Sequence, residues 1–147
     1  MLLSNLLKLL SNYKTVNFSD VEITGLSYNS KTVKKGNIFI CIKGEISDGH
    51  NYVKQAVEAG ASAIFCEHEL DIAIPQIVVE DTKRTMAYIA SAFYFEPSKS
   101  INLIGVTGTN GKTTVTHLVQ KILEENQEKC ALIGTLGYKL SGNDEYK

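Results

Sequence analysis

Apolar and polar residues follow one another along the chain in a pattern that predicts strands and helices in turn. Residues 38–42 (IFICI) are apolar at consecutive positions, and residues 61–66 and 76–79 contain shorter runs of the same kind. Such runs are typical of strands covered on both faces. Residues 21–28 alternate instead, as expected for a half-buried strand. Strands that alternate with helices predict an α/β fold.

Four helices are predicted from apolar residues spaced three or four positions apart. The first covers residues 3–10, and the second, from residue 52, stops at Gly60. The third starts after Asp81 as its N-cap and ends before Pro97. The fourth follows residue 111, and its predicted inward residues are Val115, Leu118, Val119 and Ile122.

The segment PSKS at residues 97–100 predicts a junction between two domains, over residues 1–98 and 99–147. In the second, an apolar strand at 101–106, the fourth helix and a strand at 130–133 are expected to form one β-α-β unit. One such unit is too small to cover both faces of a parallel sheet. We therefore expect the front part of a longer protein, inactive alone, which self-associates through its unfinished sheet.

Composition narrows the function classes. The 147 residues carry a net charge of −1 and contain no basic run longer than Lys34-Lys35, so we expect no nucleic-acid partner. Residues 1–10 lack the basic start of a signal peptide, and no later apolar run is long enough to span a membrane. Three cysteines without C-x-x-C spacing indicate reduced core residues, namely Cys41, Cys66 and Cys130. We expect a cytoplasmic protein.

The motif GVTGTNGKTT at residues 105–114 predicts a phosphate-binding loop between a strand and a helix. Glycines allow a tight turn, Lys112 can reach the β- and γ-phosphates, and Thr113 supplies a hydroxyl for Mg²⁺. Val106 stands where the common pattern has its first glycine, and an ordinary Gly/Thr loop is the alternative interpretation. The predicted ATP-binding residues are Gly108, Thr109, Asn110, Gly111, Lys112, Thr113 and Thr114.

This loop resembles the ATP loop of the Mur ligases, which build the peptidoglycan stem peptide. The front half also resembles that family, in the same order and spacing. Its matching segments are Asn29-Ser30-Lys31, Gly36-Asn-Ile-Phe39, Asp48-Gly49-His50-Asn-Tyr52 and Gly60-Ala61. Asn29 and Lys31 depart from the family's Asp and Arg, so the resemblance assigns those two positions no role.

The resemblance implies a small N-terminal α/β domain that holds the UDP end of the substrate, followed by the first β-α-β unit of a P-loop ATPase domain. The implied UDP contacts are Tyr28, Ser30, Glu45, Ile46 and Ser47. Lys112 is implied as the catalytic group that stabilises the transferring phosphoryl, with Thr113 as the Mg²⁺ ligand. A turn hydroxyl that bonds its own backbone is the alternative interpretation of Ser30.

Residues 131–138 most resemble the family member that adds the third amino acid to UDP-MurNAc-L-Ala-D-Glu. The implied reaction uses ATP and Mg²⁺ and passes through an acyl phosphate, which the incoming amino acid attacks. The sister ligase that adds the terminal dipeptide remains an alternative. A stand-alone UDP-sugar-binding module and an unrelated P-loop ATPase or kinase are two further alternatives.

The remaining polar residues are assigned structural roles. His50, His68 and His117 have no spacing typical of a metal site and are predicted to be surface or capping histidines. Asp48 is expected to shape its loop through an Asx turn. A solvated acidic connector is predicted from Glu67, Glu69 and Asp71.

Overall fold

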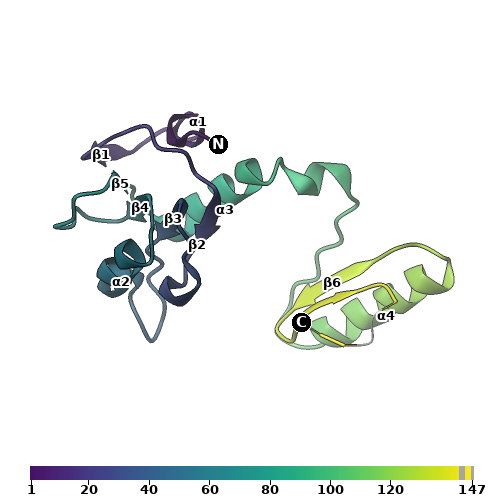
Figure 1. The fold of residues 1–147 in the computed structure, drawn as a ribbon. Helices are drawn as coiled ribbons and strands as arrows, with labels where there is room; N and C mark the ends of the chain where they lie inside the picture. The colour runs from purple at the N-terminus through teal and green to yellow at the C-terminus, as the bar shows by residue number, and fades with distance from the viewer. Residues whose placement is uncertain (143–144, 147) are drawn as a thin grey trace. The chain divides into compact units, whose positions relative to one another are not determined.

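The chain divides into two compact units in the computed structural model, which describes residues 1–142, 145 and 146. Unit 1 covers Met1–Ile101 and unit 2 covers Asn102–Lys147. Both can be followed by colour in Figure 1, from the purple N-terminus to the yellow C-terminal hairpin.

Unit 1 is built on one five-stranded sheet in the order β1-β5-β4-β3-β2. The strands are β1 (Lys14–Val16), β2 (Gly25–Ser27), β3 (Asn37–Ile40), β4 (Ala63–Cys66) and β5 (Gln76–Val78). Neighbouring strands from β2 to β5 run parallel, whereas β1 pairs antiparallel with β5 at the edge. The mixed α/β class expected from the sequence is confirmed, although β1, with its polar Lys14 and Thr15, was not predicted.

Helices cover both faces of this sheet. α1 (Leu3–Leu7) and α3 (Thr82–Phe93) pack on one face, and α2 (Val53–Glu58) packs on the other. Three short 3₁₀ helices complete the unit: η1 (Ser30–Thr32), η2 (Gly49–Tyr52) and η3 (Pro97–Ser100). Two of them, η1 and η2, lie in the loops that follow β2 and β3, where the substrate residues are predicted.

The central strands are buried on both faces because their side chains alternate between two cores. Ile38 and Ile40 of β3 contribute to the core under α1 and α3, while Phe39 contributes to the core under α2. In β4, Phe65 contributes to the core under α1 and α3, and Cys66 contributes to the core under α2. The interpretation of consecutive apolar residues as doubly covered strands is therefore confirmed.

The predicted ends of α2 and α3 are observed, whereas α1 ends at Leu7 and does not reach residue 10 as predicted. The side chain of Asp81 accepts a hydrogen bond from the amide of Arg84 at 2.8 Å and so caps α3. Gly60 follows α2 with φ of 100°, a left-handed conformation that favours glycine. α3 ends at Phe93, four residues before Pro97.

Unit 2 differs from the expected β-α-β arrangement. It contains α4 (Lys112–Glu125) and an antiparallel hairpin of β6 (Ala131–Gly134) and β7 (Gly137–Leu140). The prediction of a strand at 101–106 is wrong, since residues 102–107 have no regular structure. A strand needs a partner for its backbone groups, and β6 pairs locally with β7 instead.

The predicted inward face of α4 is wrong as well. Val115, Leu118 and Ile122 are exposed and Val119 is half-buried, whereas Gln120 is the buried residue of the helix. Among the described residues, the strand at 101–106 that was expected to cover this apolar face is absent. Self-association through this region stays a prediction.

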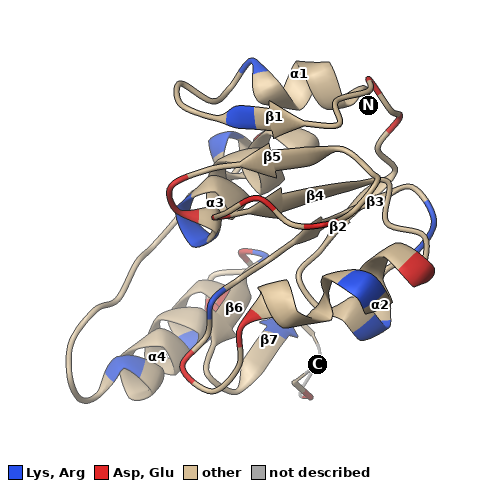
Figure 2. Cartoon of the chain, turned by 90° about the vertical axis from the view of Figure 1, so that its left-hand side faces the viewer, with Lys and Arg blue, Asp and Glu red and all other residues tan. Residues whose placement is uncertain are grey.

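Charged residues of both signs are interspersed along the described chain, as the blue and red segments of Figure 2 show. In residues 1–142, 145 and 146, no helix has the length and apolar character needed to cross a bilayer.

The three cysteines should differ sharply in reactivity. Cys41 and Cys66 are fully buried, and burial raises the pKa of both thiols, that of Cys66 to about 11. Because the thiolate is the reactive form, a thiol reagent at pH 8 should modify only the partly exposed Cys130 in the folded protein. Mass spectrometry of protein labelled before and after denaturant would check this, and rapid labelling of Cys41 or Cys66 without denaturant would contradict it.

Candidate functional site

The loops predicted to bind substrate leave unit 1 at the carboxyl ends of its parallel strands. The first loop follows β2 and carries Tyr28 and Ser30, and the second follows β3 and carries residues 45–47. β2 and β3 are neighbours in the sheet, so both loops leave the same edge side by side. Open α/β sheets bind their ligands in the crevice outside this carboxyl edge.

In the first loop, Asn29 and Ser30 have separate roles. The Asn29 side chain caps η1 by accepting a hydrogen bond from the Lys31 amide at 3.0 Å, a role that an aspartate would serve equally. The Ser30 hydroxyl donates to Oε1 of Gln55 on α2 at 2.7 Å, so it does not bond its own backbone. Tyr28 beside them is 67% exposed.

The second loop forms a narrow turn over residues 43–48, which we call the substrate turn. Lys43 and Asp48 are bridged across its base, and the Gly44 amide donates to the Ser47 carbonyl at 2.9 Å. Glu45, Ile46 and Ser47 form its tip and are exposed, Ile46 completely. The three predicted contact residues are therefore presented together to solvent.

Asp48 and Gly49 fix the base of this turn. The Asp48 carboxylate accepts the His50 amide at 2.9 Å, which confirms the predicted Asx turn. Hydrogen bonds from the backbone amide and the ring of His50 hold the pKa of that carboxyl below its ordinary value. At position 49, a Cβ would lie 2.7 Å from the Ile42 nitrogen and 3.0 Å from the Cys41 Cα, so only glycine fits without a backbone shift.

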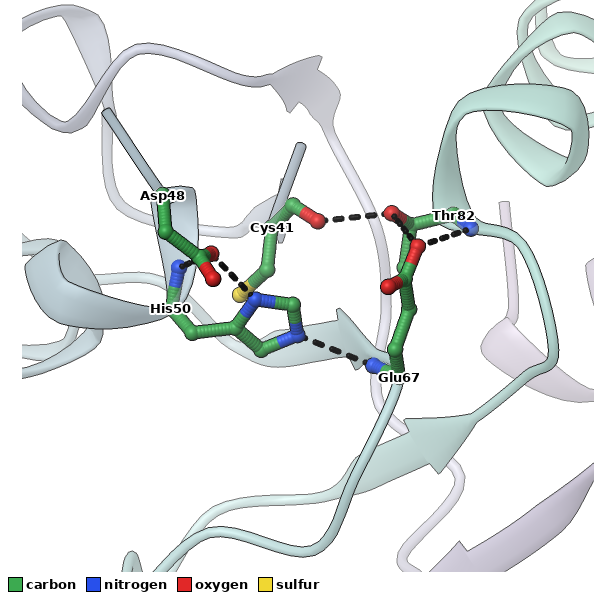
Figure 3. A network of polar contacts seen from close by, with 5 residues as sticks. All are labelled: Cys41, Asp48, His50, Glu67 and Thr82. Carbon is green, nitrogen blue, oxygen red and sulfur yellow. Dashed lines mark hydrogen bonds and ion pairs between the residues drawn. The ribbon is translucent and has the colours of Figure 1, made fainter. Parts of the chain in front are cut away.

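A network of polar contacts continues from this base across the sheet (Figure 3). Nδ1 of His50 lies 2.6 Å from Asp48 Oδ1, and its Nε2 accepts the Glu67 amide at 2.9 Å. The Thr82 amide donates to the Glu67 carboxylate at 3.2 Å. The Thr82 hydroxyl lies 2.7 Å from the Cys41 carbonyl and 3.0 Å from the same carboxylate. The ends of β3 and β4 and the start of α3 are thereby joined.

Two of these residues were assigned incorrectly from the sequence. Of the two roles predicted for His50, surface or capping, the surface role is wrong, because its side chain is only 5% exposed. Glu67 is not simply part of a solvated connector, since it is partly buried and bonds the first residue of α3. His68 is exposed, as predicted, and its ring stacks on that of His50 with centroids 4.5 Å apart. The spacing in Asp48-Gly49-His50 could have indicated the contact between His50 and Asp48. The Glu67 amide, which His50 also contacts, lies 17 residues away and could not be predicted in this way.

In unit 2 the loop predicted to bind phosphate directly precedes α4. Gly108 and Gly111 have φ of 147° and 77°, and the helix starts at Lys112 with no side chain as its cap. The uncapped first turn of a 14-residue helix leaves amide groups and a partial positive charge available to an anion. The Lys112 ammonium donates to the Gly108 carbonyl within the loop.

A hollow of about 230 Å³ opens beside this helix start, between the loop and the hairpin. Lys112, Thr113 and Thr116 line it together with Tyr146, whose hydroxyl bonds His117 at 2.6 Å. Residues 1–142, 145 and 146 contain no cluster of three His, Cys, Asp or Glu side chains arranged for a metal. Mg²⁺ needs only one or two protein ligands when phosphates supply the rest, and the exposed Thr113 hydroxyl fits that role.

The comparisons with known proteins agree with this arrangement. The model of the Mur ligase family, catalytic domain, matches residues 22–94, and that of the Mur ligase middle domain matches residues 106–147. A UDP-N-acetylmuramoyl-L-alanyl-D-glutamate–2,6-diaminopimelate ligase from Listeria monocytogenes serotype 4b is 51% identical over 120 residues, which are 82% of this chain and 24% of that protein.

Solved structures show the same likeness. The structure of a UDP-N-acetylmuramoyl-L-alanyl-D-glutamate–2,6-diaminopimelate ligase matches with a TM-score of 0.66 and 29% identity over 82% of this chain and 25% of the other. MurF ligase from Thermotoga maritima in complex with ADP matches with a TM-score of 0.55 and 31% identity, over 68% and 23% respectively. The chain thus spans about a quarter of the length of these proteins. On these grounds, the chain belongs to the Mur ligase family.

Proposed function

We propose that unit 1 binds the uridine diphosphate end of UDP-MurNAc-L-Ala-D-Glu and that unit 2 binds Mg-ATP, as parts of a cytoplasmic ligase. The observation that carries this proposal is the position of the two predicted substrate loops at the carboxyl edge of one parallel sheet. The proposed contacts in these loops are Tyr28, Ser30, Glu45, Ile46 and Ser47. Reduced, buried Cys41 and Cys66 suit a reducing compartment.

The proposed reaction activates the terminal carboxylate of the substrate by phosphorylation and joins it to an amino acid. Lys112 neutralises charge on the transferring phosphoryl group, and the amides of residues 108–114 hold the phosphates. Thr113 would hold Mg²⁺ through its hydroxyl, and the ion would supply further neutralisation of the phosphate charge. The structure of the Thermotoga maritima ligase is a complex with ADP, which supports the use of a nucleotide by this chain.

A third-residue ligase is favoured over the dipeptide-adding sister. Solved structures of both types resemble the chain at about 30% identity, so fold alone does not separate them. Sequence similarity favours the third-residue ligase, because the relative at 51% identity is named a 2,6-diaminopimelate ligase. This name also supports a diaminopimelate as the amino acid added. A UDP-sugar-binding module remains the second candidate, supported by a sheet in unit 1 that is complete without unit 2.

Ser30→Ala should weaken UDP binding about tenfold, because it removes one buried hydroxyl from the proposed site. An NMR titration of isotope-labelled protein with UDP would give the affinity and should shift resonances in residues 28–30 and 43–48. Ser19→Ala is the matched control, since Ser19 is exposed and, among the described residues, makes a hydrogen bond only through its backbone carbonyl. Absence of UDP binding to the unmodified chain would contradict the proposed function.

A further inference from the structure

His50 is held in one defined tautomer by its two neighbours. A backbone amide can only donate, so the Glu67 amide at 2.9 Å requires an unprotonated Nε2. The ring proton of neutral His50 is then on Nδ1 and is donated to the Asp48 carboxylate at 2.6 Å. Figure 3 shows the imidazole between these two partners, with one ring nitrogen directed at each.

This ring joins the substrate turn to the middle of the sheet. Asp48 is the last residue of the substrate turn, and Glu67 directly follows β4. Glu67 is fixed in turn by two bonds to Thr82 at the start of α3. The position of the turn base therefore depends on a buried side chain whose partners come from elements far apart in the sequence.

We propose that His50 is a positioning residue for the substrate turn and that its bond to the Glu67 amide pre-orders residues 45–47 for the uridine diphosphate ligand. This inference rests on the proposed function, because the ligand is the one proposed there for unit 1. A turn ordered before binding loses less conformational entropy when the ligand arrives. His50 itself acts through Asp48 and does not contact the ligand.

Two substitutions separate the two bonds of the ring. In His50→Asn, the side-chain amide can donate to Asp48 but is too short to reach Glu67. In His50→Gln, the longer side chain places an oxygen near the position of Nε2, where it can accept the Glu67 amide. We expect UDP to bind His50→Asn about tenfold more weakly than the unmodified chain, with most of the affinity restored in His50→Gln. His117→Gln in unit 2 controls for the loss of a histidine.

UDP titration by NMR, with urea unfolding of each variant, tests the proposal. Equal UDP affinity of His50→Asn and the unmodified chain would overturn it, even if the variant is less stable. Ser30→Ala in the same series separates the two proposals. If Ser30→Ala binds UDP more weakly while His50→Asn binds it as tightly as the unmodified chain, only the proposed role of His50 is contradicted. If the unmodified chain does not bind UDP, the proposed function and the proposed role of His50 are both contradicted.

A measurement on the unmodified protein covers the case in which His50→Asn does not fold. Long-range proton–nitrogen NMR of the histidine rings identifies which nitrogen carries the proton. At neutral pH, His50 should have a protonated Nδ1 and an unprotonated Nε2, and saturating UDP should shift the Glu67 amide resonance. A proton on Nε2 of the neutral ring, or a Glu67 amide unaffected by bound UDP, would overturn the proposal.

Discussion

Lys112→Ala should weaken Mg-ATP binding by about tenfold to a hundredfold, as expected for the loss of a charged contact to phosphate. The lysine is the first residue of α4 and lines the hollow beside the phosphate loop. Its ammonium bonds the Gly108 carbonyl, a contact that a phosphate oxygen would replace. Isothermal titration of the purified chain with Mg-ATP measures the change directly.

Lys121→Ala is the matched control for this experiment. Lys121 lies on the same helix, is exposed, and pairs with Glu124 at 3.9 Å, away from the loop. Its removal changes the net charge by the same amount as removal of Lys112. Similar losses in both variants would mean that overall charge sets the affinity, and the assignment of Lys112 would then be wrong.

Phe65→Ala should lower the free energy of unfolding of unit 1 by about 3–5 kcal/mol, the usual result of removing a buried aromatic ring. Phe65 is fully buried on the central strand β4, in the core under α1 and α3. A domain of this size typically has about 5–15 kcal/mol of stability, so the variant would lose much of its folded population. Urea unfolding followed by circular dichroism measures the loss.

Phe95→Ala provides the comparison, because the Phe95 side chain is 86% exposed beyond the end of α3. We expect its effect to stay within about 0.5 kcal/mol. If both phenylalanines gave the same small change, Phe65 would not be a core residue and the packing of the sheet would need revision.

The sequence predicts unit 1 well where local pattern and tertiary packing agree. The run at 38–42 is apolar at every position because β3 lies inside a sheet covered on both faces. Asp81 caps α3 by accepting the amide of Arg84, only three residues away, so its role is also visible in the local sequence. β1 was missed because Lys14 and Thr15 are exposed at the edge of the sheet, where pairing with β5 alone defines the strand.

Unit 2 shows the limit of pattern reasoning. Residues 101–106 are apolar enough for a strand, but strand formation depends on a pairing partner that the pattern does not specify. The glycine at position 137, with φ of 112°, follows the two-residue turn that lets β6 pair with β7. The same absent strand explains why the apolar face of α4 is exposed.

Among the site residues, motif similarity located the loops but not the contacts that hold them. The resemblance places Ser30 in the first substrate loop, but its bond to Gln55, 25 positions away in the sequence, was not predicted. The function of His50 depends on the Glu67 amide, a backbone group that no side-chain pattern reveals. Non-local hydrogen bonds of this kind require the folded chain.

The substrate turn and Gly49, which directly follows it, include both rigid and replaceable positions. At its base, Gly49 is fixed by the backbone of Cys41 and Ile42. At its tip, residues 45–47 extend into solvent, where side-chain changes leave both cores untouched. A combinatorial library limited to these three proposed contact positions would therefore vary the proposed ligand site at little risk to folding.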